Sequence, residues 1–238
     1  MPRTALWKSI AEALTADVAS GQYAPGDKLP TEAELSARFG VNRHTVRRAL
    51  ADMAASGAVH ARRGSGVFVA ARPTDYALGR RVRFHQAVAA SGRTPSRQIT
   101  LRQTRACTDR EAAALGLQTG ALVQVIEGIS LADGQPLAAF RSIFPAARFP
   151  DLLAQMAQTS SVTTALAACG LGDYQRASTR ITAKLARSLL ALTLRLPEGA
   201  PILRSEAVNV EAQGVPVEYG TTWFAGDRVT LTVAPDQP

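Results

Sequence analysis

The sequence predicts an α+β fold in two parts. A small N-terminal part holds three helices and a β-hairpin, and a larger C-terminal part mixes helices with antiparallel strands. Apolar residues recur every three or four positions near the N-terminus, as in amphipathic helices. The C-terminal half contains strand-like runs separated by glycine turns. Basic residues gather before residue 105, and residues 74–105 hold seven Lys and Arg against one Asp.

Spacing and capping residues predict the three N-terminal helices. The first helix carries apolar residues at intervals of four, at Leu6, Ile10, Leu14 and Val18. Thr31 with Glu34 three positions later fits a capping box, in which each side chain accepts a hydrogen bond from a free backbone N–H. Gly40 ends this second helix. Asn42 is a suitable N-cap for a third helix that runs to about Ser56.

The third helix has one apolar side and one basic side. At about 100° per residue, the apolar positions share one third of the helical wheel; they are Val46, Ala49, Leu50 and Met53. The neighbouring arc holds Arg43, His44, Arg47 and Arg48. Residues 58–73 then predict a strand, a glycine turn and a second strand. Three helices followed by such a hairpin indicate a winged helix-turn-helix.

A helix-turn-helix places the start of its recognition helix, which is the third helix of this chain, in the major groove of DNA. Arg43, His44, Thr45 and Arg47 are therefore candidates for reading base edges, since Arg can donate two hydrogen bonds to guanine. The alternative is that the basic side of this helix is simply exposed to solvent and binds nothing. The full predicted DNA-binding set is Asn42, Arg43, His44, Thr45, Arg47, Arg48, Arg62, Arg63 and Gly64. Within this set, Arg48, Arg62 and Arg63 are assigned to phosphates, and Gly64 is assigned to the wing tip. The net charge of +8 favours double-stranded DNA as a partner.

The C-terminal part is predicted as a mixed antiparallel α+β domain. Its expected elements are a strand over 96–106, a helix over 109–117, a hairpin turned at Asp133–Gly134, a helix over 161–171, a strand running into a helix over 178–196, and a meander of two or three strands over 201–233. The expected organisation is a DNA-binding domain (1–72), a basic linker (73–96) with a short helix near Phe84–Ala90, and an effector-binding and dimerisation domain (97–238).

Several function classes find no support in the sequence. Cys107 and Cys169 are the only cysteines, so we expect reduced thiols. The histidines are isolated from one another, and neither a metal site nor a cofactor-binding motif is expected. No apolar run reaches the roughly 18 residues of a membrane helix, and the charged N-terminus is unlike a signal peptide. We expect a cytoplasmic protein that needs no cofactor.

The N-terminal part resembles the GntR superfamily of bacterial transcription regulators. The likeness is carried by the run YAPGDKLPTEAELSARFGVNRHTVRRALADMAASGAVHARRGSGVFV. The C-terminal part resembles the ligand-binding domain of the HutC-type subfamily, whose fold is similar to chorismate lyase. Its matching pieces are ADGQPLAAFRSIFP, the region of Ser161, and GVPVEYG. The resemblance implies a homodimeric repressor that reads an inverted repeat and is controlled by a small effector.

Within that subfamily, the likeness is to regulators of phosphonate uptake and degradation genes. It is carried by ARFGVNRHTVRRAL, RPTDYALGRRVRF, RASTRITAKLA and PVEYGTTWFAGD. Three alternatives remain open. The effector can be another metabolite, such as an amino-sugar phosphate or a histidine-pathway acid. The chain can be a DNA-binding scaffold without a small ligand, or an enzyme similar to chorismate lyase.

A small anionic effector, such as a phosphonate or phosphate ester, needs arginines and hydroxyl donors. The candidate effector-binding residues are Arg141, Ser161, Arg176, Arg180, Glu218 and Tyr219. Arg176 and Arg180 share one side if their strand is regular. By resemblance, Ser161 matches a phosphate-contacting serine, and Glu218 and Tyr219 match pocket positions that can bind an amine or hydroxyl. Relatives that bind phosphorylated sugars commonly carry basic residues where this chain has Gly128 and Ser130.

Overall fold

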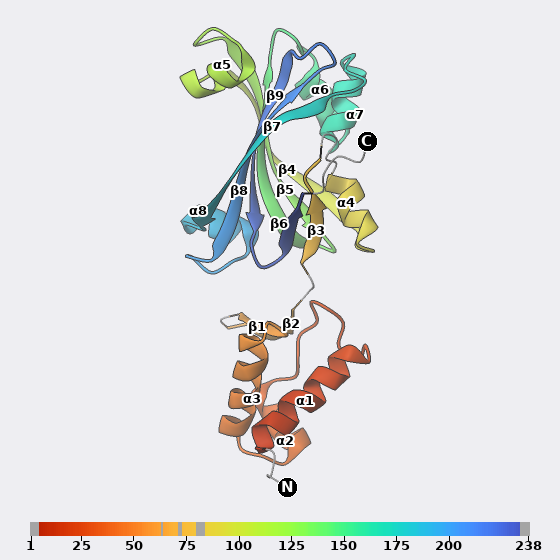
Figure 1. Cartoon of the computed structure of the whole chain (residues 1–238), viewed down its shortest axis with the longest axis vertical. Helices are drawn as coiled ribbons and strands as arrows, with labels where there is room; N and C mark the ends of the chain where they lie inside the picture. Colours follow the sequence, from red (N-terminus) through yellow and green to blue (C-terminus); the bar gives the residue numbers. More distant parts are fainter. Residues whose placement is uncertain (1–4, 63, 71–72, 80–83, 234–238) are drawn as a thin grey trace. The chain divides into compact units, whose positions relative to one another are not determined.

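The structure is a computed structural model that describes residues 5–62, 64–70, 73–79 and 84–233. The chain divides into two compact units, Met1–Arg72 and Pro73–Pro238 (Figure 1). Each unit has a hydrophobic core of its own. The mixture of helices and antiparallel strands confirms the predicted α+β class.

The first unit is a three-helix bundle with a β-hairpin. Its elements are α1 (Leu6–Ala19), α2 (Glu32–Phe39), α3 (Arg43–Ala55), β1 (Val59–Arg62) and β2 (Gly66–Val69). The two strands pair antiparallel. All four apolar residues predicted on α3 are buried, and they pack with Ile10, Leu14 and Leu35 of the other two helices. The apolar side of α3 therefore holds it in the bundle, and its basic side stays outside.

Local hydrogen bonds determine where α2 and α3 begin. Glu34 accepts a hydrogen bond from the backbone N–H of Thr31 at 2.7 Å, and the N–H of Glu34 donates to the Thr31 hydroxyl at 3.3 Å. Gly40 adopts φ 64°, a left-handed conformation that suits glycine and ends α2. The Asn42 side chain then accepts from the N–H of Thr45 at 2.9 Å and caps α3. These are the caps that the sequence predicts.

The second unit is built around one antiparallel sheet. Its elements are β3 (Thr74–Ala77), α4 (Phe84–Ala90), β4 (Pro95–Ala106), α5 (Asp109–Leu115), β5 (Leu122–Ala132), β6 (Gln135–Pro145), α6 (Leu152–Gln158), α7 (Val162–Ala168), β7 (Gln175–Leu185), α8 (Ser188–Leu194), β8 (Pro201–Val210), β9 (Pro216–Ala225) and β10 (Val229–Thr232). Six strands form the sheet, in the order β4-β5-β6-β9-β8-β7. Strands β4 and β7 are its edges.

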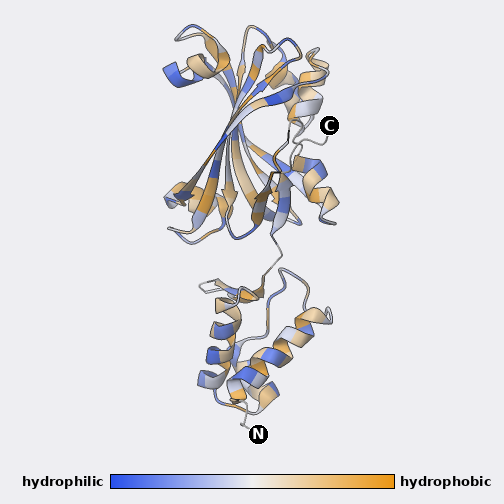
Figure 2. Ribbon diagram, viewed as in Figure 1, coloured by the Kyte–Doolittle hydropathy of each residue, from blue (hydrophilic) through white to orange (hydrophobic). Residues whose placement is uncertain are grey.

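Helices cover both faces of the sheet (Figure 1). The cores under α4, α6 and α7 include Phe140, Val217 and Phe224, and those under α5 and α8 include Ile143 and Trp223. Successive side chains of a strand point to opposite faces. From Ala138 to Phe144 on β6 and from Glu218 to Phe224 on β9, the even-numbered residues therefore face α4, α6 and α7. Val217 joins the same core because it lies at the register shift between β8 and β9. Figure 2 shows hydrophobic residues on the strands and helices of this unit where they meet.

Two segments depart from the sequence-based expectation. The stretch 73–96, expected as a linker, contributes β3, α4 and the start of β4 to the second unit. The expected meander of two or three strands is confirmed with two strands, β8 and β9. β10 leaves the large sheet and pairs in parallel with β3, with Val229 opposite Thr74. Helix α6 was not predicted at all.

Candidate DNA interface and effector cavity

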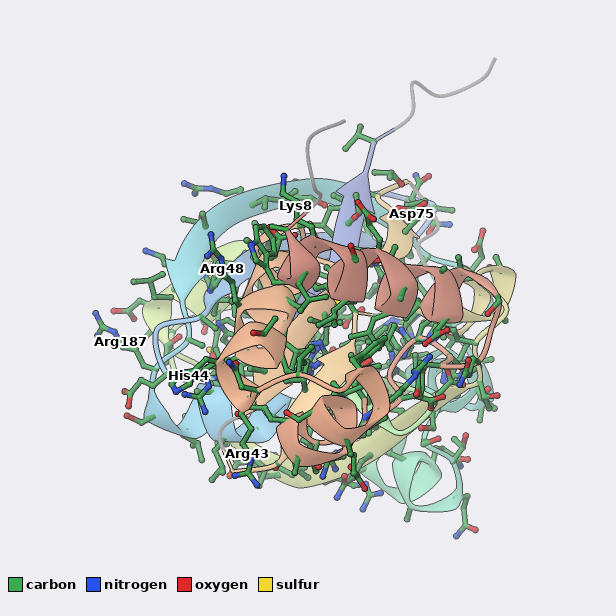
Figure 3. All side chains as sticks on the ribbon, turned by 90° about the horizontal axis from the view of Figure 1, so that it is seen from below. Lys8, Arg43, His44, Arg48, Asp75 and Arg187 are labelled. Carbon is green, nitrogen blue, oxygen red and sulfur yellow. The ribbon has the colours of Figure 1, made fainter. Side chains whose placement is uncertain are left out.

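The basic side of α3 is the candidate DNA interface. Arg43, His44 and Arg48 are exposed, and Figure 3 shows them spread along the outer side of α3. Asn42 and Thr45 serve the helix itself, because the side-chain amide oxygen (Oδ1) of Asn42 accepts from both the backbone N–H and the hydroxyl of Thr45. These two residues therefore fix where the helix starts and how Arg43 and His44 are presented.

Arg47 is held by an acidic residue of the neighbouring helix. Its Nε and Nη2 donate to the two carboxylate oxygens of Glu32 on α2, at 3.0 and 2.7 Å. The hydrogen bonds from Arg47 lower the pKa of Glu32, which therefore stays ionised at neutral pH. A two-point contact of this kind orients the guanidinium plane. Sequence reasoning placed Arg47 at the interface and did not foresee this partner.

Arg48 is supported by an aromatic ring of the first helix. Its guanidinium carbon lies 4.7 Å from the centroid of the Trp7 ring, within the range of a cation–π contact. Lys8 of α1 lies 5.6 Å from the same ring. Two cations from different helices thus share one surface around Trp7. This arrangement favours phosphate contact for both.

The β-hairpin supplies the wing. Arg62 lies opposite Gly66 in the β1–β2 register, Gly64 has φ 74°, and Arg63 lies outside the described residues. Lys28 crosses over the wing, because a Cβ at Gly66 would lie 2.7 Å from its Cε. Lys28 was missed from the sequence, since the loop before α2 gives no signal that it meets the wing. Its backbone bridge to Phe68 brings it there.

The second unit contains a cavity of about 360 Å³ between the sheet and the segments that cover it. The sheet contributes residues of β4, β6, β7, β8 and β9, and the covering side is formed by Tyr76 of β3, by Phe84, His85 and Gln86 of α4, and by residues 161–164 at the start of α7. Ser161, Arg176 and Glu218 of the predicted effector set line it. Arg141, Arg180 and Tyr219 do not.

A β-bulge separates Arg176 from Arg180. The register of β7 on β8 shifts between Arg176 and Ser178, so Arg176 lies opposite Asn209 and Arg180 lies opposite Glu206. Asn209 faces the cavity, and Glu206 is an odd number of residues away on β8, on the other face. The expectation that the two arginines share one side is therefore wrong. Its premise, a regular strand, fails at Ala177.

The other two residues lie on the far face of the sheet with partners of their own. Arg141 donates to Glu127 at 2.6 Å, across the β5–β6 pair. The Tyr219 hydroxyl donates to Glu206 at 3.0 Å. Burial and this carboxylate raise the pKa of Tyr219, which keeps its phenol protonated. Both side chains are engaged in contacts within the protein.

Ser161 and Glu218 reach the cavity from opposite sides. The Ser161 hydroxyl accepts from the backbone N–H and the hydroxyl of Thr164 at 3.2 and 3.0 Å, which leaves its own proton for another acceptor. Glu218 is buried, and one of its carboxylate oxygens accepts from the Asn209 amide at 2.7 Å. Among the described residues, no hydrogen bond reaches the second oxygen of Glu218, which can therefore accept from a donor in the cavity.

Arg97 is a cavity residue that sequence reasoning did not select. Its guanidinium carbon lies 4.6 Å from the Phe140 ring centroid and 5.9 Å from that of Phe84. Within the described part of the chain, its buried Nε has no hydrogen-bond partner, and neither has the Nε of Arg176. Burial lowers the pKa of Arg97, but a guanidinium remains charged at neutral pH. The strand over 96–106 was predicted, but the sequence did not indicate that the side chain of Arg97 lines a cavity.

The cavity carries a net positive charge. Arg97 and Arg176 outnumber Glu218, and burial together with Arg97 lowers the pKa of His85, so this imidazole is neutral at neutral pH. The described residues contain no cluster of three or more His, Cys, Asp or Glu suited to a metal ion. None of the described helices has both the length and the apolar character needed to cross a bilayer. A small anion is the ligand type that suits such a lining.

Family models match both units. Residues 6–69 match the model described as bacterial regulatory proteins of the gntR family, and residues 90–230 match the UTRA domain. The chain is 38% identical over 230 residues to an HTH-type transcriptional regulator of Rhizobium meliloti, covering 96% of this chain and 94% of that one. It is 31% identical over 212 residues to the Escherichia coli protein named "Probable transcriptional regulator PhnF", covering 89% and 88%.

A solved structure agrees with the fold. The crystal structure of PhnF from Mycobacterium smegmatis superposes with a TM-score of 0.65 at 24% identity, covering 96% of this chain and all of that one. A winged helix-turn-helix joined to a unit with a small-molecule cavity defines a ligand-responsive transcription regulator that binds DNA. The chain belongs to the GntR family of bacterial regulators, with a C-terminal UTRA domain of the HutC and PhnF type.

Proposed function

We propose that the protein is a homodimeric repressor of phosphonate uptake and degradation genes, controlled by a small anionic effector in the cavity of the second unit. The observation that carries the effector part is the pair of partly buried arginines, Arg97 and Arg176, whose buried Nε atoms lack hydrogen-bond partners in the described chain. The phosphonate part is supported by the relative named PhnF, at 31% identity over most of both chains.

In this proposal, Arg43 and Arg47 read base edges while Arg48, Lys8 and Lys28 neutralise phosphates. Arg62, Arg63 and Gly64 place the wing against the backbone. Asn42 and Thr45 fix the residue at which α3 begins and so position Arg43 and Arg47. His44 lies beside these base-reading residues. Two such DNA-binding units, one from each protomer, read an inverted repeat whose half-sites lie about one helical turn apart, or a multiple of that. The effector is held by Ser161, Arg176, Glu218 and Arg97.

The covering wall of the cavity suggests how an effector is sensed. Tyr76 and Phe84 belong to the first strand and helix after the boundary between the units, and their rings lie 6.4 Å apart. A ligand that touches these rings acts on the segment that leads to the DNA-binding unit. Coupling between two such sites is typically about 1–3 kcal/mol, and operator DNA then weakens effector binding by the same factor.

Because the chain belongs to a family of transcription regulators, we favour ligand binding in this cavity over the turnover of a substrate by a lyase-like enzyme.

A footprinting experiment distinguishes a phosphonate effector from another metabolite. DNase footprinting on the region upstream of the neighbouring genes should show a symmetric protected site, and adding 2-aminoethylphosphonate should reduce protection. Protection without symmetry would contradict the dimer. Release by glucosamine 6-phosphate and by none of the phosphonates would replace the phosphonate proposal with the amino-sugar one.

A further inference from the structure

We infer that Arg97 is the residue that selects the effector's anionic group, and that the effector is a small zwitterion with a phosphonate or phosphate monoester at one end and an ammonium at the other. This inference rests on the proposed role of the cavity as the effector site. It goes further by naming the residue that binds the anion and the chemical class that the lining accepts.

Arg97 is held ready for an anion by two aromatic rings. Phe140 of β6 and Phe84 of α4 contact its guanidinium, and aromatic faces stabilise a cation without using its N–H donors. Arg97 forms no ion pair with a carboxylate among the described residues, although it is partly buried. A cation that is partly withdrawn from solvent and has no anionic partner raises the free energy of the folded protein. An anion in the cavity would remove that cost and take up the unused donors.

Gly128 explains why Arg97 of β4, and no residue at position 128 of β5, supplies the positive charge. A Cβ at Gly128 would lie 2.8 Å from two atoms of the Phe140 ring and would also overlap the backbone oxygen of Gln98. The ring therefore lies over Gly128, where no side chain fits, and Arg97 lies over the ring. Ser130 is opposite Arg97 in the β4–β5 register. The positive charge of this corner is thus placed on β4 rather than β5.

The charges of the lining define both ends of the ligand. Arg97 and Arg176 can together neutralise a phosphate monoester, which carries about −1.5 to −2 at neutral pH, or a phosphonate, which carries somewhat less charge. Glu218 is the carboxylate on the same cavity, and the Asn209 amide fixes one of its oxygens at 2.7 Å. A plain dianion would lie near this carboxylate and be repelled. An ammonium on the same ligand would pair with it instead.

The test is isothermal titration calorimetry on the full-length protein with four probes. 2-Aminoethylphosphonate and O-phosphoethanolamine carry both ends, ethylphosphonate lacks the ammonium, and ethanolamine lacks the anion. The variants are Arg97→Ala, Arg97→Lys and Glu218→Gln. Arg180→Ala is the matched control, because it removes an arginine from the same sheet on the face away from the cavity. Operator binding without ligand, measured on each variant, shows that the DNA-binding unit is intact.

The wild-type protein should bind both zwitterions more tightly than ethylphosphonate or ethanolamine, and the tighter zwitterion identifies phosphonate or phosphate ester as the source. Arg97→Ala should weaken the zwitterions about 10- to 100-fold, as expected for the loss of hydrogen bonds between charged groups. Arg97→Lys should recover part of this loss. Glu218→Gln should abolish the preference for the ammonium, and Arg180→Ala should bind like wild type.

Undiminished affinity in Arg97→Ala would overturn the role of Arg97. Equal affinity of the wild type for ethylphosphonate and 2-aminoethylphosphonate, or the absence of binding by any probe, would overturn the zwitterion class. All three outcomes leave operator binding unaffected. Failure of the proposed regulator function would instead appear as loss of specific DNA binding by the wild-type protein without ligand, so the two failures are distinguishable.

Discussion

The arginines of α3 have different surroundings although they lie within six residues of the chain. Arg43 is exposed at the first turn, Arg47 is oriented by Glu32, and Arg48 rests on Trp7. An arginine free to meet a base edge contributes to sequence discrimination, whereas one that meets the backbone contributes equally on every sequence. The surroundings of each side chain therefore separate roles that the residue type alone does not.

Arg43→Ala and Arg48→Ala should differ in how they weaken DNA binding. Arg43→Ala should lower affinity for the operator by about 1–3 kcal/mol and relax discrimination at one base pair. Arg48→Ala should weaken binding to operator and random DNA alike and reduce the slope of log affinity against log salt by about one. Fluorescence anisotropy titrations at several salt concentrations measure both. Identical behaviour of the two variants on specific and random duplexes would refute the assignment.

At the scale of the element, local signals account for the helix starts and the turns. The capping box at Thr31, the N-cap at Asn42 and the glycine at position 40 are each read from a few adjacent residues. The bulge in β7 is different. It arises where β7 pairs with β8, and nothing in the run Arg176–Arg180 marks Ala177 as the extra residue. Register depends on both strands of a pair, so the sequence of one strand does not reveal it.

Asn42→Ala should destabilise the first unit by roughly 1 kcal/mol, because it removes the hydrogen bond that caps α3. The two tryptophans, Trp7 and Trp223, lie in different units, so a Trp223→Phe background reports the unfolding of the first unit through Trp7. Urea unfolding followed by fluorescence gives the free energy.

Thr108→Ala is the control for this measurement. Thr108 caps α5 in the second unit through its own box with Glu111, at 3.4 and 2.9 Å. Its loss should leave the Trp7 transition unchanged. An Asn42→Ala protein as stable as its parent would show that the cap contributes nothing to the fold of this unit.

At the scale of the whole molecule, the second unit leaves apolar side chains at its surface. Leu189 and Leu192 of α8 are each 76% exposed, and Leu185 at the end of the edge strand β7 is 65% exposed. Residues three apart lie on the same side of a helix, so Leu189 and Leu192 form one apolar strip. Exposed apolar surface of this kind often marks an interface between proteins.

In the proposed homodimer, with this strip at its interface, replacing both Leu189 and Leu192 with Glu should shift the full-length protein toward monomer and weaken binding to a two-half-site operator. The physical reason is that buried like charges would face each other across the interface. Sedimentation velocity over a range of concentrations measures the change. Leu122→Glu is the control, since Leu122 is also exposed (59%) and lies at the start of β5, apart from α8. A double variant that dimerises as the wild type does would exclude this strip as the interface.

The sequence by itself determined most of the local elements of this protein, though not α6 or β3. The winged helix-turn-helix, the basic side of α3 and the hairpin at Asp133–Gly134 follow from periodicity, caps and turn residues that act within a few positions. Only the tertiary structure decided which residues meet. It paired β10 with β3, turned Arg180 away from the cavity, and brought Arg97 between Phe84 and Phe140 from three distant segments. Such contacts depend on strand order and register, which are properties of the packed sheet.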